Sequence, residues 1–193
     1  MSITTADHPV TFDIQYPDKL HRFMWLIKPI LAIPHIVLLM LLGILFYVRV
    51  VVAWFTVVFT GKYPQGLFES NVQFLRYALN VGAYISFQTD IYPAFGTTPK
   101  PDSPVKFDLA YPPNGEINRL DTLIPLIRVI KMIVPIIIMY FRAIISAILM
   151  YIAPFAILFT GNYPKGMFDF VLETQRMSAK IQMNLLFMTD AKP

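Results

Sequence analysis

The chain has 193 residues, of which 56% are hydrophobic and only 15% are charged. Soluble domains usually carry about 25% charged residues, and a core of this size cannot cover so much apolar sequence. The absence of cysteine excludes disulfides, thiolate metal ligands and cysteine nucleophiles. The net charge is +4, and no basic stripe is interleaved with aromatic residues, so we expect no nucleic-acid partner. The composition predicts an integral membrane protein.

The sequence contains an internal duplication. The ten residues 59–68 return one hundred residues later as 159–168. Matches at the same offset extend from Lys28 and Arg128 to Asp90 and Asp190. We therefore divide the chain into membrane repeat 1 (residues 9–95), a proline-rich linker (96–103) and membrane repeat 2 (104–190). The prolines of the linker favour an extended spacer.

Each repeat begins with a short segment in which apolar and polar residues alternate, at residues 10–16 and 105–111. A period of two predicts a strand, and a proline ends each segment. Since an isolated strand is marginal, the two copies could pair with each other in a small sheet outside the membrane. An extended segment in contact with lipid is the alternative.

A long apolar run follows in each repeat, at residues 29–59 and 133–159. The ionisable residues within them are His35 and Arg49 in the first run and Arg142 in the second. One membrane span needs about 20 residues, and a two-helix hairpin needs about twice as many. The runs lie between these lengths, so each could form a transmembrane or re-entrant helical hairpin or one long helix.

Two patterns favour the hairpin. Arg49 and Arg142 each follow aromatic residues, a combination typical of a headgroup boundary. Basic residues flank both ends of each run, which under the positive-inside rule predicts cytoplasmic flanks on a multi-pass or re-entrant chain. Against the hairpin, neither supposed tip contains Gly, Asn or Pro. In one continuous helix, both arginines would lie at membrane depth and would be functional candidates.

The repeated motif reads as a rigid structural joint between two helices. Threonine can bond back to the last helical turn, glycine can adopt the left-handed conformation that ends a helix, and proline prevents its continuation. We expect the tyrosine ring to lie at the membrane surface and the phenylalanine to return to the apolar layer. The joint residues are Thr60, Gly61, Tyr63, Pro64, Gly66 and Phe68, and Thr160, Gly161, Tyr163, Pro164, Gly166 and Phe168.

Helical periodicity resumes after each joint. It predicts two amphipathic helices of about 20 residues that lie in the plane of the membrane surface. On the second helix, Glu173 and Arg176 are three residues apart, so an intrahelical ion pair is the simplest expectation. As contacts for lipid phosphate or a protein partner, we consider Arg49, Arg76, Arg142 and Arg176.

We find no catalytic constellation in the sequence. The three histidines have no metal-ligand spacing, and no glycine-rich nucleotide motif is present. The apolar runs contain no acidic residue, whereas an ion or proton pump normally needs one there. We therefore predict no enzyme, no cofactor and no metal site.

The chain resembles a bacterial membrane-protein family known as domain of unknown function 4389, in tandem duplication. The resemblance is carried by Tyr16 and Pro17, Lys28, residues 33–35, 53–55 and 59–68, Arg76, and residues 89–93. It covers residues 12–95 well and 107–190 more loosely. Repeat 2 lacks the Pro-His pair, the tryptophan before the joint and the Tyr-Pro pair at its end. The resemblance implies a bacterial inner (plasma) membrane location and supplies no activity.

These patterns predict an all-α membrane protein of two repeats with short strand-like entry segments. We expect a non-enzymatic integral membrane scaffold or accessory subunit of a larger membrane assembly, with a shape suited to bending the bilayer. Its partners would be lipids and other membrane proteins or a second copy. One alternative is an oligomeric small transporter or channel element, in which Arg49 or Arg142 lines an anion path. Another is a lipid-binding membrane protein that uses Arg76 and Arg176.

Overall fold

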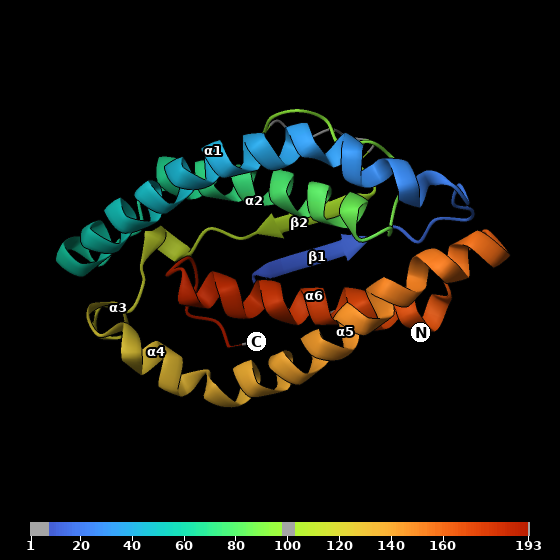
Figure 1. Cartoon of the computed structure of the whole chain (residues 1–193). Helices are drawn as coiled ribbons and strands as arrows, with labels where there is room; N and C mark the ends of the chain where they lie inside the picture. The colour runs from blue at the N-terminus through green and yellow to red at the C-terminus, as the bar shows by residue number, and fades with distance from the viewer. Residues whose placement is uncertain (1–7, 98–102, 193) are drawn as a thin grey trace.

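The computed structural model describes residues 8–97 and 103–192 and is mostly helical (Figure 1). Both repeats contain a strand, a long apolar helix and a shorter helix. The elements are β1 (Val10–Ile14), α1 (Met24–Thr60), α2 (Gln65–Ile85), β2 (Val105–Leu109), the 3-10 turn η1 (Pro113–Gly115), α3 (Arg119–Leu123), α4 (Pro125–Lys131), α5 (Ile133–Thr160) and α6 (Lys165–Leu185).

The two entry segments pair with each other. β1 and β2 form a two-stranded antiparallel sheet in which Val10 lies opposite Leu109 and Phe12 opposite Phe107. In both strands the residues at alternate positions are buried, while Thr11 and Lys106 are exposed. The expected pairing of the two repeats through these strands is confirmed.

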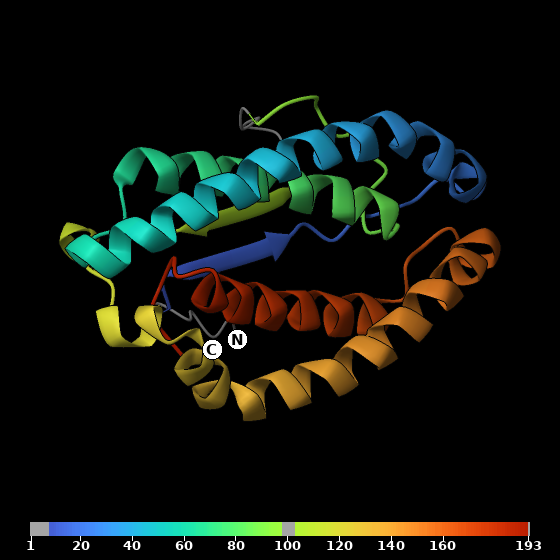
Figure 2. The same cartoon turned by 60° about the vertical axis from the view of Figure 1, so that its left-hand side comes forward.

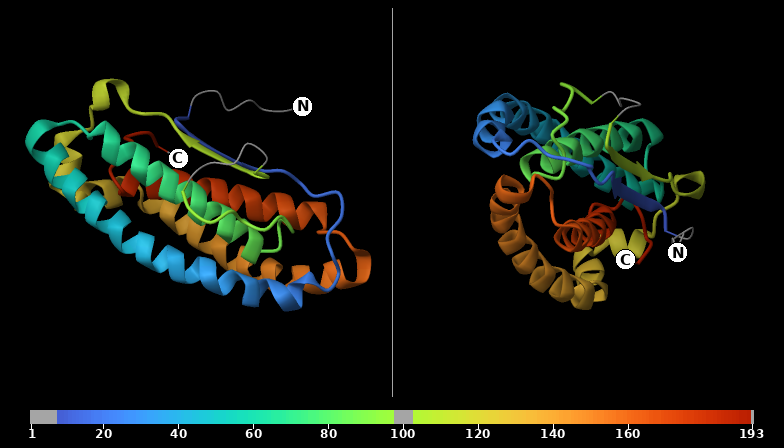
Figure 3. Two further views of the ribbon diagram at one scale, coloured as in Figure 1. Left: turned by 90° about the horizontal axis from the view of Figure 1, so that it is seen from above. Right: turned by 90° about the vertical axis from the view of Figure 1, so that its right-hand side faces the viewer.

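The protein has three layers (Figures 1 and 2). The sheet covers α2 and α6, and these helices in turn pack against α1 and α5. The end-on view in Figure 3 places α1 and α5 on the side of the molecule away from the sheet. α2 and α6 therefore occupy the middle layer, where their apolar side chains are covered from both sides.

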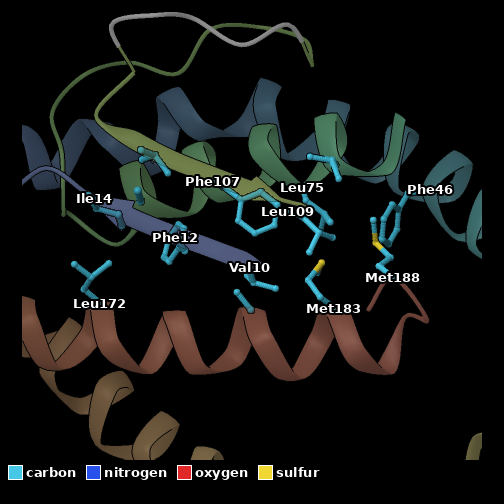
Figure 4. Packing of buried hydrophobic residues seen from close by; sticks show 14 of the residues in the cluster. Val10, Phe12, Ile14, Phe46, Leu75, Phe107, Leu109, Leu172, Met183 and Met188 are labelled. Carbon is cyan, nitrogen blue, oxygen red and sulfur yellow. The ribbon is translucent and has the colours of Figure 1, made fainter. Parts of the chain in front are cut away.

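The strands exchange between the repeats. β2, from repeat 2, packs on α2 of repeat 1, whereas β1, from repeat 1, packs on α6 of repeat 2. Figure 4 shows the resulting core, in which Phe12 and Phe107 lie between the two helices with Leu75 and Met183 nearby. Burying an apolar side chain of this size contributes about 2 kcal/mol, so this shared core links the two repeats.

The predicted hairpins are absent from both repeats, and this correction concerns the fold class. α1 continues without a turn through Arg49 for 37 residues, and α5 continues through Arg142 for 28. The lack of Gly, Asn or Pro beside either arginine was the correct signal, because nothing there can end a helix. The break in repeat 2 comes earlier, at Met132, where Pro135 has no amide hydrogen to continue the ladder from α4.

The amphipathic helices form where the periodicity predicts them, but their apolar sides do not face lipid. Phe68, Val72, Leu75 and Val81 of α2 are buried within the protein. Because the sheet and the long helix cover α2 on opposite sides, no broad apolar side of this helix remains for a membrane surface. The apolar side of α2 and, by the same packing, that of α6 are therefore part of the protein core, and the location of these helices at the membrane surface stays a prediction.

Candidate functional site

Each joint ends its long helix by the chemistry that the sequence indicates. Gly61 and Gly161 have φ angles of 75° and 76°, in the left-handed region, and their amides donate to the carbonyls of Val57 and Ile157. The Thr60 hydroxyl donates to the carbonyl of residue 56 at 2.7 Å and accepts from the amide of residue 62. Local hydrogen bonds within the joint therefore fix its shape, independently of contacts with other segments.

The joint tyrosines, whose rings were expected at the membrane surface, are buried within the protein. Tyr63 is 1% exposed and Tyr163 is fully buried. Burial raises the pKa of each phenol to about 12, while the Asn71 amide, which donates to the Tyr63 hydroxyl at 3.0 Å, opposes the shift at Tyr63. In repeat 2, Val171 replaces the asparagine. The described residues give the Tyr163 hydroxyl no hydrogen-bond partner.

Each joint is held by the residues that follow the strand of the other repeat. The Tyr111 hydroxyl and the Ile117 amide donate to the carbonyls of Tyr63 and Gly61 in joint 1 (residues 59–68), the latter at 3.0 Å. The Arg119 guanidinium also donates to a carbonyl of this joint. The equivalent donors to joint 2 (residues 159–168) come from repeat 1, and they are the Tyr16 hydroxyl and the Leu20 amide. The joints are thus docking points between the repeats.

Two of the arginines proposed as lipid or partner contacts are partly exposed and bind other segments of the same chain. Arg76 on α2 donates to the Phe107 carbonyl at 2.9 Å and forms an ion pair with Asp108 at 2.7 Å. Arg176 on α6 makes the same pair of contacts with β1, to the carbonyl of residue 12 and the carboxylate of residue 13. These arginines bind strands of the opposite repeat to the middle helices. The predicted pair of Glu173 with Arg176 is not formed.

Arg142 and Arg49 lie at different places on the long helices. Arg142 is directed toward α6, where it lies 3.5 Å from the Glu173 carboxylate and 4.5 Å from the centre of the Phe170 ring. Arg49 lies half-buried in the middle of α1. Both are within continuous helix, and the two positions are not equivalent in the repeats. Contact of any of the four arginines with lipid or a partner stays a prediction.

A buried cation joins the start of the long helical segment to the end of the repeat. Lys28 is 2% exposed, and its amine donates to the Thr89 carbonyl at 2.9 Å and pairs with Asp90 at 2.7 Å. The other oxygen of the Asp90 carboxylate accepts from the His21 amide. Repeat 2 builds the same arrangement with Arg128 in place of the lysine. Lys28 and Asp90 both have counterparts in repeat 2, but nothing in the sequence indicates that the two form a pair.

Repeat 1 also contains a buried histidine that repeat 2 lacks. The Nδ1 atom of His35 lies 2.7 Å from the Tyr77 hydroxyl, and the ring stacks on Phe95 with Tyr92 at its edge. Within residues 8–97 and 103–192, no polar atom lies in hydrogen-bonding reach of the Nε2 atom. At the equivalent position repeat 2 has Pro135. The arrangement is an aromatic cage around one histidine.

The structure offers no metal centre among the residues it describes, since no three His, Asp or Glu side chains gather there.

The comparisons with known families give the same duplication as the structure. A family described as Domain of unknown function (DUF4389) matches residues 22–96 and again residues 125–193.

The chain belongs to the DUF4389 family. It carries this domain twice, as the tandem resemblance predicts. The matches begin after β1 and β2, so the exchanged strands lie outside both matched stretches. No curated protein and no solved structure is detectably similar to the chain.

The most extensive exposed feature of this DUF4389 protein is the apolar surface of α1 and α5, which we call the apolar face. Both helices are long and apolar enough to cross a membrane. Each buries one stripe against the middle layer and exposes large apolar side chains elsewhere, among them Ile44, Phe59, Tyr151 and Phe155. Monomeric soluble proteins rarely expose apolar patches larger than a few hundred Å², so this face marks a contact surface.

Two apolar grooves open on this face. The first has a volume of ≈ 640 Å³ and lies between the beginning of α1, the end of α2 and the second half of α5, with Trp25, Pro29 and Met150 in its lining. The second has a volume of ≈ 820 Å³ and lies between the middle of α1, α2 and the end of α6. Their linings are almost entirely apolar, so they suit hydrocarbon better than a polar substrate.

Proposed function

We propose that this DUF4389 protein is a non-enzymatic membrane scaffold or accessory subunit of the bacterial inner membrane. It would bind lipid through the apolar face and would hold other membrane proteins, or a second copy of itself, through its remaining surface. The observation that carries the proposal is the division of the molecule into an apolar side, made by α1 and α5, and a sheet side with exposed Thr11, Asp13, Lys106 and Asp108.

The contacts of four basic side chains support a scaffold. Lys28, Arg76, Arg128 and Arg176 all hold one segment of the protein to another through carbonyls and carboxylates. Such contacts give a rigid body that needs no substrate to complete it. A rigid body with one apolar side and one polar side is suited to presenting a fixed surface to partners at the membrane.

The test is purification of the tagged protein from its native membrane in mild detergent, followed by mass spectrometry of the proteins that remain bound. The proposal expects stoichiometric membrane-protein partners. A matched pair of variants sharpens the result. Lys106→Glu changes the exposed side of the sheet, whereas Lys165→Glu makes the same charge change on α6, where the lysine forms a local pair with Asp169.

If the sheet side holds the partner, Lys106→Glu weakens recovery of the partner more than Lys165→Glu does, at equal amounts of folded protein. Recovery of a homo-oligomer with a central polar channel and no other protein would contradict the scaffold proposal. That outcome would favour the transporter alternative.

A further inference from the structure

We propose that the protein binds the membrane from one side only. In this arrangement α1 and α5 lie parallel to the bilayer plane within the cytoplasmic leaflet, and neither helix crosses. The occupant of the apolar face is then the acyl layer of a single leaflet that contains anionic lipid. This inference rests on the proposed function, because it specifies how the scaffold meets its membrane.

The first argument is that α1 cannot be oriented independently of the polar layers. α2 returns antiparallel along α1, with Phe74 stacked on Phe46 and the Tyr77 hydroxyl bonded to His35. The start of α1 is fixed as well, because Lys28 bonds to the Thr89 carbonyl beyond the end of α2. β2 packs on α2 in turn. If α1 crossed the bilayer, α2 and the sheet would have to enter the hydrocarbon with it.

The second argument is the depth at which the charged groups would then lie. Arg76 is adjacent to Phe74 and Tyr77, which contact the middle half of α1, and its partner Asp108 is 70% exposed. Asp13, on β1, is 62% exposed. A charged residue at the centre of the bilayer costs about 3 kcal/mol, so a crossing arrangement would pay this cost several times. With the helices in the plane, the sheet remains in water at no such cost.

The third argument is length. At 1.5 Å per residue, the 37 residues of α1 and the 28 of α5 extend for about 55 and 42 Å. The hydrocarbon layer is about 30 Å thick. Each helix is longer than the thickness that a single crossing must span. A helix that lies in the plane has no such limit.

The fourth argument is the distribution of basic residues. α1 and α5 run in opposite directions, so joint 1 and joint 2 lie at opposite ends of the molecule (Figure 1). A basic side chain of the other repeat lies at each joint: the Arg119 guanidinium donates to the Thr60 carbonyl in joint 1, which also contains Lys62, and Arg22 lies beside Gly161 in joint 2. Both ends therefore carry basic side chains. The positive-inside rule places both on the cytoplasmic side, and each Lys or Arg near anionic lipid contributes about 1 kcal/mol.

The grooves of the apolar face fit the same arrangement. The first groove is bordered by Leu26, Tyr151 and Phe155, which are 54%, 80% and 63% exposed. It therefore opens toward the same side as the apolar face. Acyl chains of the leaflet can fill this space, which would otherwise be an apolar hollow in contact with water.

The chain has no cysteine, so single cysteines can be introduced without a background. Lys19→Cys and Gln65→Cys lie before and after α1, and both positions are exposed. We expect a membrane-impermeant maleimide to label both in inverted membrane vesicles and neither in intact spheroplasts. Labelling of the two positions from opposite sides would show that α1 crosses, and would overturn the inference.

A depth measurement tests the inference a second way. Ile33, Ile44 and Phe55 are spaced eleven residues apart, which is close to three helical turns, and they are 56%, 64% and 50% exposed. Each is replaced by cysteine, labelled with a fluorophore and quenched by spin-labelled lipids in phosphatidylethanolamine–phosphatidylglycerol vesicles. We expect equal, shallow depths at all three positions. A deep position 44 between two shallow ones would overturn the inference.

Two controls separate the inference from the proposed function on which it rests. Thr11→Cys, on the exposed side of the sheet, should show no lipid quenching in the in-plane arrangement, whereas a crossing that drew the sheet into the hydrocarbon would quench it. Flotation of the wild-type protein with vesicles reports membrane binding alone. A protein that floats but labels from both sides contradicts only the in-plane arrangement, whereas one that does not float contradicts the membrane scaffold as well.

Discussion

Replacing Arg128 with methionine tests whether the buried cations hold each repeat together. Arg128 is 2% exposed, and its guanidinium donates to the carbonyls of Asn184 and Thr189 at 2.8 and 3.1 Å. It also forms an ion pair with Asp190 at 2.6 Å. Burial lowers the pKa of the guanidinium and Asp190 opposes the shift, but the group stays charged at neutral pH.

The magnitude follows from the groups that methionine would leave behind. Removing one partner of a buried ion pair costs about 3–5 kcal/mol. Because Asp190 is 39% exposed, water can solvate its carboxylate after the change, which favours the lower end of this range. The two buried carbonyls lose their donor and add to the cost. We expect Arg128→Met to lower the free energy of unfolding by about 3 kcal/mol.

The chain itself supplies the matched control, because Lys28 makes the equivalent contacts in repeat 1 with a single amine. Arg128→Lys keeps the charge but loses the forked geometry, so we expect a cost of about 1 kcal/mol. The measurement is reversible unfolding in mixed micelles followed by tryptophan fluorescence. The reasoning would be refuted if the two variants lost equal amounts of unfolding free energy. It would also be refuted if Arg128→Met lost less than a surface substitution does.

Three further outcomes are expected. Gly161→Ala should lower the free energy of unfolding by about 1 kcal/mol, because residue 161 has a positive φ. Gly61→Ala should lower it more, because a Cβ there also meets the guanidinium that docks on joint 1. Thermal melts of the two variants compare them directly. The pKa values of Tyr63 and Tyr163 are raised to about 12, so the neutral phenols favour the folded state. Their contribution to the free energy of unfolding should be intact below pH 10 and lost between pH 10 and 12. Ultraviolet titration of tyrosinate and unfolding measurements over this range would show it. Arg76→Gln should lower the unfolding free energy by about 1–2 kcal/mol, because it removes a partly exposed ion pair and a carbonyl hydrogen bond between α2 and β2.

Local features of the fold were predictable from local chemistry. The alternation in residues 10–14 and 105–109 predicted the two strands, and the glycines at positions 61 and 161 predicted the helix ends. The duplication was readable because the two copies stay in one register over a long stretch. In each case the residues that specify the structure lie within a few positions of each other, so no knowledge of the tertiary fold is needed.

The exchange between the repeats was not predictable in this way. Arg76 and Arg176 have the same neighbours along the chain, and each repeat supplies its own Phe-Asp pair in the strand. Sequence alone therefore cannot distinguish an arginine that binds its own strand from one that binds the strand of the other repeat. The same reason explains the error at Glu173, where the nearby Arg176 was expected but Arg142 of another helix is the partner.

The prediction of a hairpin was wrong because it compared the length of the apolar run only with helices that enter the bilayer across its thickness. The length of residues 29–59 favours a hairpin only if the run enters the bilayer across its thickness, and the same assumption makes Arg49 a boundary residue. The packing of α2 along α1 removes the assumption, because this contact makes a crossing costly for the charges it carries with it. The in-plane arrangement proposed above therefore rests mainly on contacts between elements and less on the length of the apolar run.

The exchange also gives a physical reason for the duplication itself. β1 and β2 each lack a partner within their own repeat, and a strand without a partner is marginal. A chain with only one such repeat would have to pair with a second copy through the same strands and joints, as exchanged elements do in symmetric dimers. Joining two repeats in one chain makes the pairing intramolecular and lets the halves differ. His35 with Tyr77 in repeat 1, against Pro135 in repeat 2, is a difference that two identical subunits could not have.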